Sequence, residues 1–299
     1  MGKGNRMNYD ALRDYISTSE LRIVNDNFRM RMAPAIAAKY DSGAYKTAID
    51  EHSGCINELS KLNLQDVLGK KPIFYTYLVP DNRLIELLNY PYQRKRGGRP
   101  VACFDSDGFI SAYGATQNTF VMLEKPSVML HVNHIHEYAH LFQGQLNPYK
   151  HVMFHEGFAE VIPWYILDYE SKCPEHVMAV VDTDVYCAND LLTNVDFRDV
   201  VEGRSCSFQK SYISSYVFIR TLVEQIQSKF GIDKTAAVKM YMKIYAESKN
   251  DKQWLVVDFA KKLGLDADKL LYTTEYQKET LQKMKTTNKI QVKTKEIDR

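Results

Sequence analysis

The chain has 299 residues, a formal net charge of +2 at pH 7 and 45% hydrophobic side chains. This length suffices for one large domain or two lobes with a well-buried core. The nearly balanced charge, without a sizeable basic block, argues against nucleic acid as the main partner. No apolar run approaches the roughly 18 residues of a membrane span, so none is expected.

Chain order divides the sequence into four predicted parts. Apolar positions at irregular helical spacing predict helices first, with a break near Ser42 and Gly43. Aromatic and β-branched runs then predict a sheet, and helical patterns follow almost to the end. The predicted parts are an N-terminal helical segment (1–70), a β-sheet lobe ending in a metal-binding helix (71–145), a helical C-terminal lobe (146–285) and a polar tail expected to be disordered (286–299).

The sheet lobe is predicted from short runs bounded by turn residues. Its expected elements are strands at 71–80, 100–105, 109–115 and 118–124, with a short helix at 83–89 and a loop at 90–100.

The cysteines and the N-terminus bear on the cellular compartment. Five cysteines, an odd number without a C-x-x-C pair, are typical of scattered reduced thiols. The N-terminal stretch lacks the apolar core of a signal peptide. A cytoplasmic location is therefore expected.

The clearest chemical motif is a pair of histidines, His136 and His140, on a predicted helix at 128–144. At a spacing of four their rings project from one helix face and can share a metal ion, most often zinc. Glu137 points to the flank of this pair and can reach a metal-bound water. Glu156 follows after a gap of 15 residues and is a candidate third ligand. Three protein ligands would leave the fourth position to water, as in catalytic zinc sites.

A second carboxylate strengthens this interpretation. Glu156 and Glu160 lie four residues apart on a predicted apolar helix that starts in 156–166. Buried carboxylates are costly unless they have partners. Metal ligation by Glu156 and a hydrogen bond from a metal-bound imidazole to Glu160 would satisfy both.

The other nearby histidines have simpler expected roles. His131 and His134 do not share the face of the motif pair well, so packing or solvent exposure is expected for them. His155 precedes Glu156 and is expected to be structural. It is also the nearest candidate for a fourth ligand, which would make the zinc a structural staple.

H-E-x-x-H followed by E-G-F-A resembles the gluzincin metallopeptidases, the group that includes thermolysin and aminopeptidase N. The resemblance implies a zincin-like α+β catalytic domain, with a small mixed β-sheet lobe and a mainly helical C-terminal lobe. It implies one zinc ion held by His136, His140 and Glu156, with Glu137 as general base. Glu160 would then support a metal ligand from behind. The gap between the two motifs is shorter than in most of the family by a few residues.

Two further segments resemble aminopeptidase N. The predicted helix at 212–231 resembles its Y-x-K-G-A segment, which implies that Tyr212 stabilises the tetrahedral intermediate, with Tyr216 as the next candidate. Ser214 and Ser215 replace Lys-Gly there. Near 114–118, Gln117 stands where a glutamate would bind the substrate amino terminus. These departures argue against a standard aminopeptidase.

The resulting hypothesis is a zinc-dependent metallopeptidase that hydrolyses peptide or protein substrates through a metal-activated water. The alternative is a catalytically inactive binding protein that keeps the gluzincin fold. All four catalytic and ligand residues of the motifs are present, which favours the enzyme.

Overall fold

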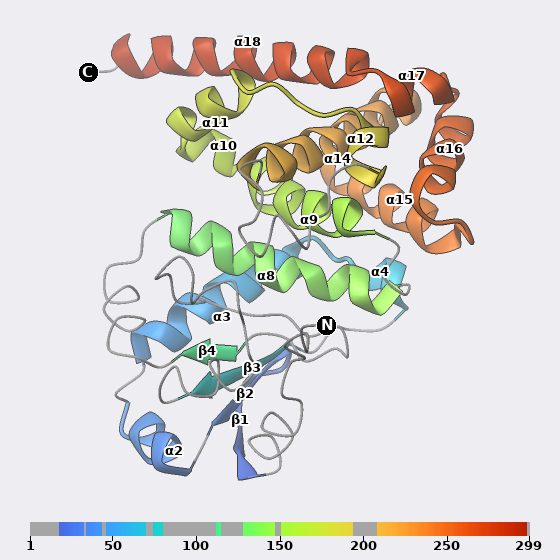
Figure 1. Ribbon diagram of the computed structural model, residues 1–299. Helices are drawn as coiled ribbons and strands as arrows, with labels where there is room; N and C mark the ends of the chain where they lie inside the picture. Colours follow the sequence, from blue (N-terminus) through green and yellow to red (C-terminus); the bar gives the residue numbers. More distant parts are fainter. Residues whose placement is uncertain are drawn as a thin grey trace, which may run out of the picture. The chain divides into compact units, whose positions relative to one another are not determined.

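A computed structural model describes residues 18–32, 34–43, 46–69, 74–79, 112–114, 128–146, 151–193 and 208–297 (Figure 1). The chain divides into two units, one ending at Phe142 and the other beginning at Gln143. The described residues are mostly helical and contain one small sheet, which is compatible with the predicted α+β class.

The first unit contains a four-stranded mixed sheet in the order β1-β2-β3-β4. β1 and β2 pair antiparallel, whereas β2 with β3 and β3 with β4 pair parallel. The strands are β1 (Glu20–Asn25), β2 (Phe28–Met32), β3 (Phe74–Val79) and β4 (Ala112–Gly114). β3 and β4 confirm the strands predicted at 71–80 and 109–115. The elements predicted at 83–89, 90–100, 100–105 and 118–124 lie outside the described residues.

The prediction that 1–70 is entirely helical is wrong at β1 and β2. Phe28, Met30 and Met32 are buried, and they alternate with the partly exposed Arg29 and Arg31. Such a period of two places one strand face against the core, which a helix could not do with these residues.

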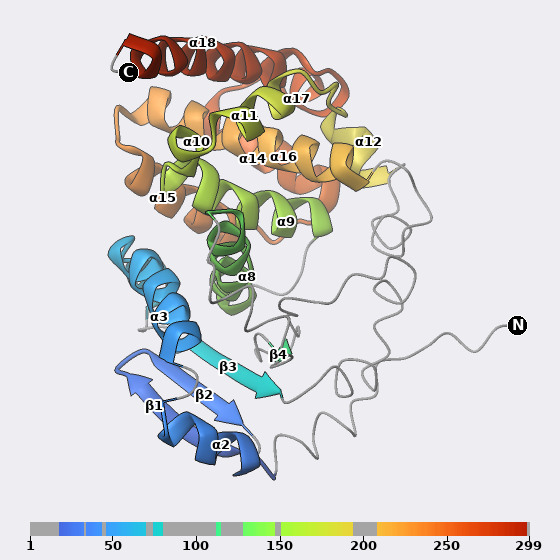
Figure 2. The same ribbon diagram turned by 90° about the vertical axis from the view of Figure 1, so that its left-hand side faces the viewer.

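Helices follow the β1–β2 hairpin, as predicted for this part of the chain. The helices of the first unit are α2 (Pro34–Asp41), α3 (Lys46–Lys61), α4 (Gln65–Leu68) and most of α8 (Val128–Leu146). The predicted break is confirmed, because α2 ends before Gly43, whose φ of +81° suits glycine. Arg22 on β1 donates to both carboxylate oxygens of Asp41, at 3.0 and 2.9 Å, and so joins the sheet to α2. Figure 2 shows α2 beside β1.

No strand occurs among the described residues of the second unit, which is built from helices around α14. α14 packs against α9, α15 and α18, and Phe154, Phe158 and Phe218 are buried there. Gly231, the last residue of the helix predicted at 212–231, ends α14 in a left-handed conformation. The helices are α9 (Val152–Val161), the π-helical η1 (Ile162–Ile166), α10 (Tyr169–Lys172), α11 (Pro174–Val181), α12 (Ala188–Thr193), α14 (Phe208–Phe230), α15 (Lys234–Glu247), α16 (Lys252–Leu263), α17 (Ala267–Tyr272) and α18 (Glu275–Ile297).

The polar C-terminal tail differs from its prediction. α18 continues through Ile297, so the segment expected to be disordered from 286 onward is helical up to that residue. The sequence from Glu275 to Ile297 contains neither glycine nor proline and is rich in lysine, glutamine and glutamate. These residues lose little side-chain freedom in a helix, which permits a polar helix to continue beyond the buried Met284.

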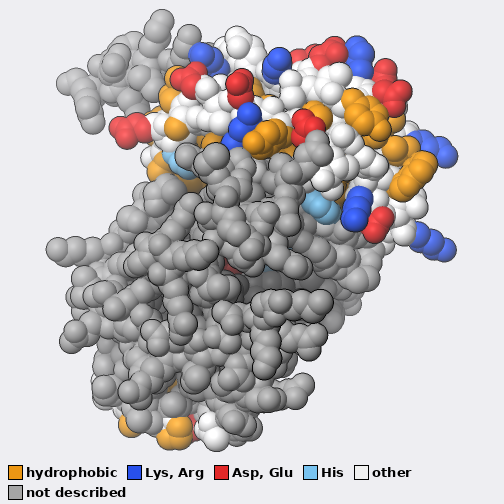
Figure 3. All heavy atoms as spheres, in the orientation of Figure 1, with side chains coloured by type: hydrophobic (Ala, Val, Ile, Leu, Met, Phe, Trp, Pro, Cys, Tyr) orange, Lys and Arg blue, Asp and Glu red, His pale blue; other side chains and the backbone are white. Residues whose placement is uncertain are grey.

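Within the part of the chain that the structure describes, no helix combines the length and apolar character needed to cross a membrane. On the face shown in Figure 3, acidic and basic side chains are interspersed among the coloured residues. This mixture agrees with the nearly balanced net charge of the sequence.

Gly157 on α9 makes a close contact with α14. A Cβ atom added there would lie 2.5 Å from both Ile219 Cγ1 and the Ser215 carbonyl oxygen of α14. Only hydrogen fits at such distances, so Gly157 allows α9 to approach the α14 backbone. The neighbouring Glu156 therefore takes its position from this contact.

Gly157→Ala is expected to lower the free energy of unfolding by about 1–3 kcal/mol, because the added methyl group overpacks the α9–α14 contact. Chemical denaturation measures the change. The matched control is Gly54→Ala on α3, where the nearest atom to an added Cβ is His131 Cε1 at 3.9 Å. Helix propensity predicts that this control is stabilising by about 0.5–1 kcal/mol. Equal stability of the two variants would contradict the close-contact argument.

Candidate metal centre

α8 brings His136 and His140 together as the sequence predicts. Their Nε2 atoms lie 3.2 Å apart, and their ring planes meet at 87° with centroids 4.8 Å apart. Two ligand nitrogens on a tetrahedral zinc, each at about 2.0–2.1 Å, would be separated by about 3.3 Å. The pair thus has the donor spacing of two ligands to one ion. The described residues include groups that could hold a metal ion, and one of them contains these histidines.

The apolar flank of α8 fixes the direction of the pair. Ile135 and Ala139 are fully buried, and Phe142 is 1% exposed, which confirms the buried helix expected at 128–144. His140 is 6% exposed, whereas His136 and Glu137 are partly exposed. His140 is thus held in the core, while Glu137 remains within reach of solvent.

Glu156 belongs to α9 of the second unit. α9 begins at Val152, where the ring of His151 accepts a hydrogen bond from the Met153 amide at 3.2 Å. This cap satisfies one backbone donor that the first helical turn leaves open. Glu156 is partly exposed, and the preceding His155 is 7% exposed. Burial lowers the pKa of His155 to about 4, so its ring is neutral at pH 7.

Glu160, on the same helix, has a defined partner. The indole nitrogen of Trp164 donates to its Oε2 at 2.9 Å, and the Trp164 ring stacks on His176 with centroids 4.2 Å apart. η1 follows α9 directly, so Glu160 and Trp164 belong to one continuous helical stretch. The indole therefore orients the Glu160 carboxylate within the second unit. The hydrogen bond from a metal-bound imidazole to Glu160 remains a prediction.

Both tyrosine candidates lie on α14 but in different environments. Tyr212 is partly exposed near the start of the helix. Tyr216 is 4% exposed, donates its hydroxyl hydrogen to Glu170 and accepts a hydrogen bond from Arg220 at 3.0 Å. Burial raises the pKa of Tyr216 well above its ordinary value. Because structural partners occupy its hydroxyl, Tyr216 is the weaker candidate for an oxyanion donor.

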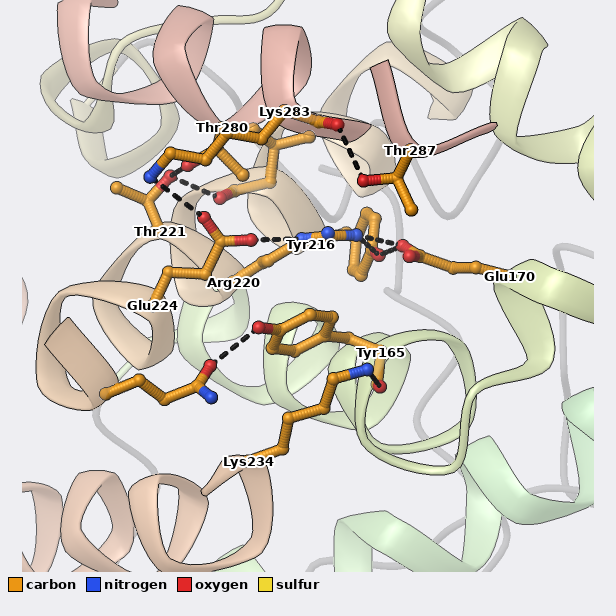
Figure 4. A network of polar contacts seen from close by, with 12 residues as sticks. Tyr165, Glu170, Tyr216, Arg220, Thr221, Glu224, Lys234, Thr280, Lys283 and Thr287 are labelled. Atoms are coloured by element: carbon orange, nitrogen blue, oxygen red, sulfur yellow. Dashed lines mark hydrogen bonds and ion pairs between the residues drawn. The ribbon is translucent and has the colours of Figure 1, made fainter. Parts of the chain in front are cut away.

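The Tyr216 hydroxyl belongs to an ionic network that sequence patterns did not indicate. Arg220 pairs with the Glu170 carboxylate, and its Nε donates to Glu224 at 2.8 Å (Figure 4). Its guanidinium also lies 4.2 Å from the centre of the Tyr165 ring. Only the i, i+4 spacings of Tyr216, Arg220 and Glu224 could have been recognised in the sequence. The partner Glu170 comes from α10 through tertiary packing.

The sequence departs from the aminopeptidase N segments at Ser214 and Ser215 and at Gln117. Ser214 and Ser215 are fully buried. The Ser214 hydroxyl donates to the Lys210 carbonyl at 2.6 Å and accepts from the Tyr186 amide at 2.9 Å. Ser214 therefore links α14 to the segment before α12. Gln117 lies outside the described residues.

A second donor group, which the sequence did not predict, occurs in the first unit. It consists of Glu51, Cys55 and His134. Glu51 and Cys55 lie four residues apart on α3, a spacing that could have marked them as facing one direction. His134 is fully buried and belongs to this donor group, whereas the sequence predicts only packing or solvent exposure for it.

Removal of Arg220 should show how much the ionic network contributes to the stability of the fold. Arg220→Met would leave the carboxylates of Glu170 and Glu224 without their main cation in a mostly buried setting, and the free energy of unfolding is expected to fall by about 3–5 kcal/mol. Denaturant titration measures this loss. The matched control is Arg22→Met, which breaks the exposed pair with Asp41 and should leave the midpoint almost unchanged. Similar losses in both variants would contradict the assigned role of burial.

The chain was also compared with known proteins. No family model, curated protein or solved structure matches it. The function therefore has to be argued from the side chains themselves.

Proposed function

We propose that this protein is a zinc-dependent metallopeptidase that hydrolyses peptide bonds in peptide or protein substrates. The observation that carries the proposal is the pair of imidazole nitrogens, His136 Nε2 and His140 Nε2, 3.2 Å apart on α8. Glu137 adjoins this pair on the same helix and is partly exposed. Two imidazoles with a flanking carboxylate are the arrangement that a hydrolytic zinc site needs.

Glu156 is the proposed third ligand. The resemblance to the gluzincins assigns it this role, and its side chain is partly exposed on α9. Two neutral imidazoles and one carboxylate suit zinc and leave its fourth position open. Gly157 supports this role because it sets the approach of α9 to α14 and so holds the backbone beside Glu156.

The remaining residues would supply the chemistry around the ion. A zinc ion held there would acidify water toward a pKa of about 7 and polarise the substrate carbonyl. Glu137 would take the proton from the attacking water and pass it to the leaving amine. Tyr212 would donate a hydrogen bond to the oxyanion. Glu160, oriented by Trp164, would hold a ligand imidazole from behind.

A binding protein that keeps the metal but has lost turnover is the alternative. The buried Ser214 and Ser215 favour it, because they occupy positions where the resemblance places Lys-Gly. Ser214 uses both hydrogen-bonding functions of its hydroxyl inside the unit. A substrate-binding role for this residue would require those contacts to break.

Glu137→Gln separates the two functions. The amide keeps the size of the side chain but cannot accept a proton, so zinc content and thermal stability should stay at wild-type levels while cleavage falls by about 10²–10⁴-fold. The measurement is cleavage of a diverse peptide library followed by mass spectrometry. A binding protein would show no metal-dependent cleavage in the wild type. Undiminished turnover by Glu137→Gln on a verified substrate would refute the general-base role.

The ligand set is tested separately by zinc content. His140→Ala and Glu156→Ala should each lower bound zinc by about one equivalent per chain after dialysis, because three-ligand sites lose most of their affinity with one ligand. Elemental analysis provides the measurement. The control is His151→Asn, which keeps a side chain able to cap α9 and should retain zinc. Full zinc in both ligand variants would rule out these residues as ligands.

A further inference from the structure

The flank of α8 away from the His136–His140 pair carries a second set of metal-ligand side chains. Successive residues on a helix turn by about 100°, so His134 points about 200° from His136. His131 and His134 instead meet Glu51 and Cys55 of α3, and both helices lie in the first unit here. The two flanks of α8 are therefore chemically separate.

The donor atoms of this set converge. Glu51 Oε1 lies 2.5 Å from His131 Nδ1 and 4.0 Å from His134 Nδ1, and Cys55 Sγ lies 3.4 Å from His131 Nδ1. One donor atom each from Glu51, Cys55 and His134 falls within 4.8 Å of the others. Bonds of about 2.0–2.3 Å to a tetrahedral zinc place donor atoms about 3.3–3.7 Å apart. The observed separations bracket this range, so small side-chain movements would complete the geometry.

We propose that Glu51, Cys55, His131 and His134 form a second, structural zinc site between α3 and α8. Thiolate, imidazole and carboxylate donors together favour zinc over magnesium or calcium, which prefer oxygen alone. Four protein ligands close the coordination shell, in contrast to the open shell proposed for the first site. The thiolate and the carboxylate also balance the charge of the ion, which matters because Cys55 and His134 are fully buried.

The surroundings suit ligands held in fixed orientations. His131 Nε2 lies 3.4 Å from Glu58, so the second nitrogen of this imidazole can donate to a carboxylate while Nδ1 faces the ion. The ring of His52 lies 4.4 Å from the His134 ring, and its Nδ1 is hydrogen-bonded to the Tyr138 hydroxyl at 3.1 Å. Carboxylate and aromatic partners of this kind hold metal-binding imidazoles in place.

Metal binding has a defined proton balance at this site. The ion replaces the Cys55 thiol proton and the proton shared by Glu51 and His131, and both leave to solvent. The ion would fasten α3 to α8, the helix that carries His136 and His140. Its expected role is to stabilise that scaffold. It takes no part in the proposed hydrolysis.

Cobalt provides a test that separates the two sites. Cobalt(II) bound to a thiolate absorbs by charge transfer in the near ultraviolet, whereas cobalt held only by imidazole and carboxylate does not. The apo protein reconstituted with cobalt should show this band. The band should persist in His136→Ala/His140→Ala, in which the first site is destroyed, and should be lost in Cys55→Ser. Cys187→Ser, which alters another buried cysteine, is the matched control and should keep the band.

Each outcome decides the proposal. A band that depends on Cys55 and survives loss of the motif histidines supports it, even if the first site proves not to bind metal. No band, or a band unchanged in Cys55→Ser, overturns it. Circular dichroism checks that Cys55→Ser is folded. If that variant does not fold, zinc-edge X-ray absorption of the wild type decides instead: a sulfur neighbour at about 2.3 Å supports the site and its absence refutes it.

Discussion

The structure depends on how α8 accommodates its imidazoles. Polar rings in an apolar helix cost free energy unless each finds a partner, so their direction is constrained. On one flank His136 and His140 lie with Nε2 atoms 3.2 Å apart. On another, His131 contacts Glu51 of α3 at 2.5 Å. The apolar residues Ile135 and Ala139 are fully buried, and their packing fixes the orientation of α8 and of the imidazoles on both flanks.

Neighbouring elements are held by contacts of their own. α3 presents Glu51 and Cys55 to α8, while Phe28, Met30 and Met32 of β2 bury one face of the sheet in the same unit. In the second unit, two contacts fix the helices: the contact of Gly157 with α14 and the ion pair of Arg220 with Glu170. The first sets the approach of α9, and the second ties α14 to α10. Neither feature carries chemistry itself, yet each fixes the helices that bear candidate residues.

Sequence patterns predicted the local features well where one periodicity was clear. The helix at 128–144, the strands near β3 and β4, and the Gly231 cap of α14 were all expected. The prediction was wrong at β1 and β2 because irregular apolar spacing in the N-terminal part hid a short period of two. It was also wrong at the polar tail, where low hydrophobicity suggested disorder although helix-forming residues continue without a break.

By itself, the sequence determined that His136 and His140 share a helix face with Glu137 beside them, because a spacing of four fixes direction on any α-helix. It could not show that Glu170 of α10 binds both Tyr216 and Arg220 of α14. It also gave no reason to join Cys55 to His131, 76 residues away. Such partnerships arise only when helices pack, since packing brings together side chains whose separation along the chain carries no periodic signal. Tertiary structure alone decided which polar residues far apart in the sequence become partners.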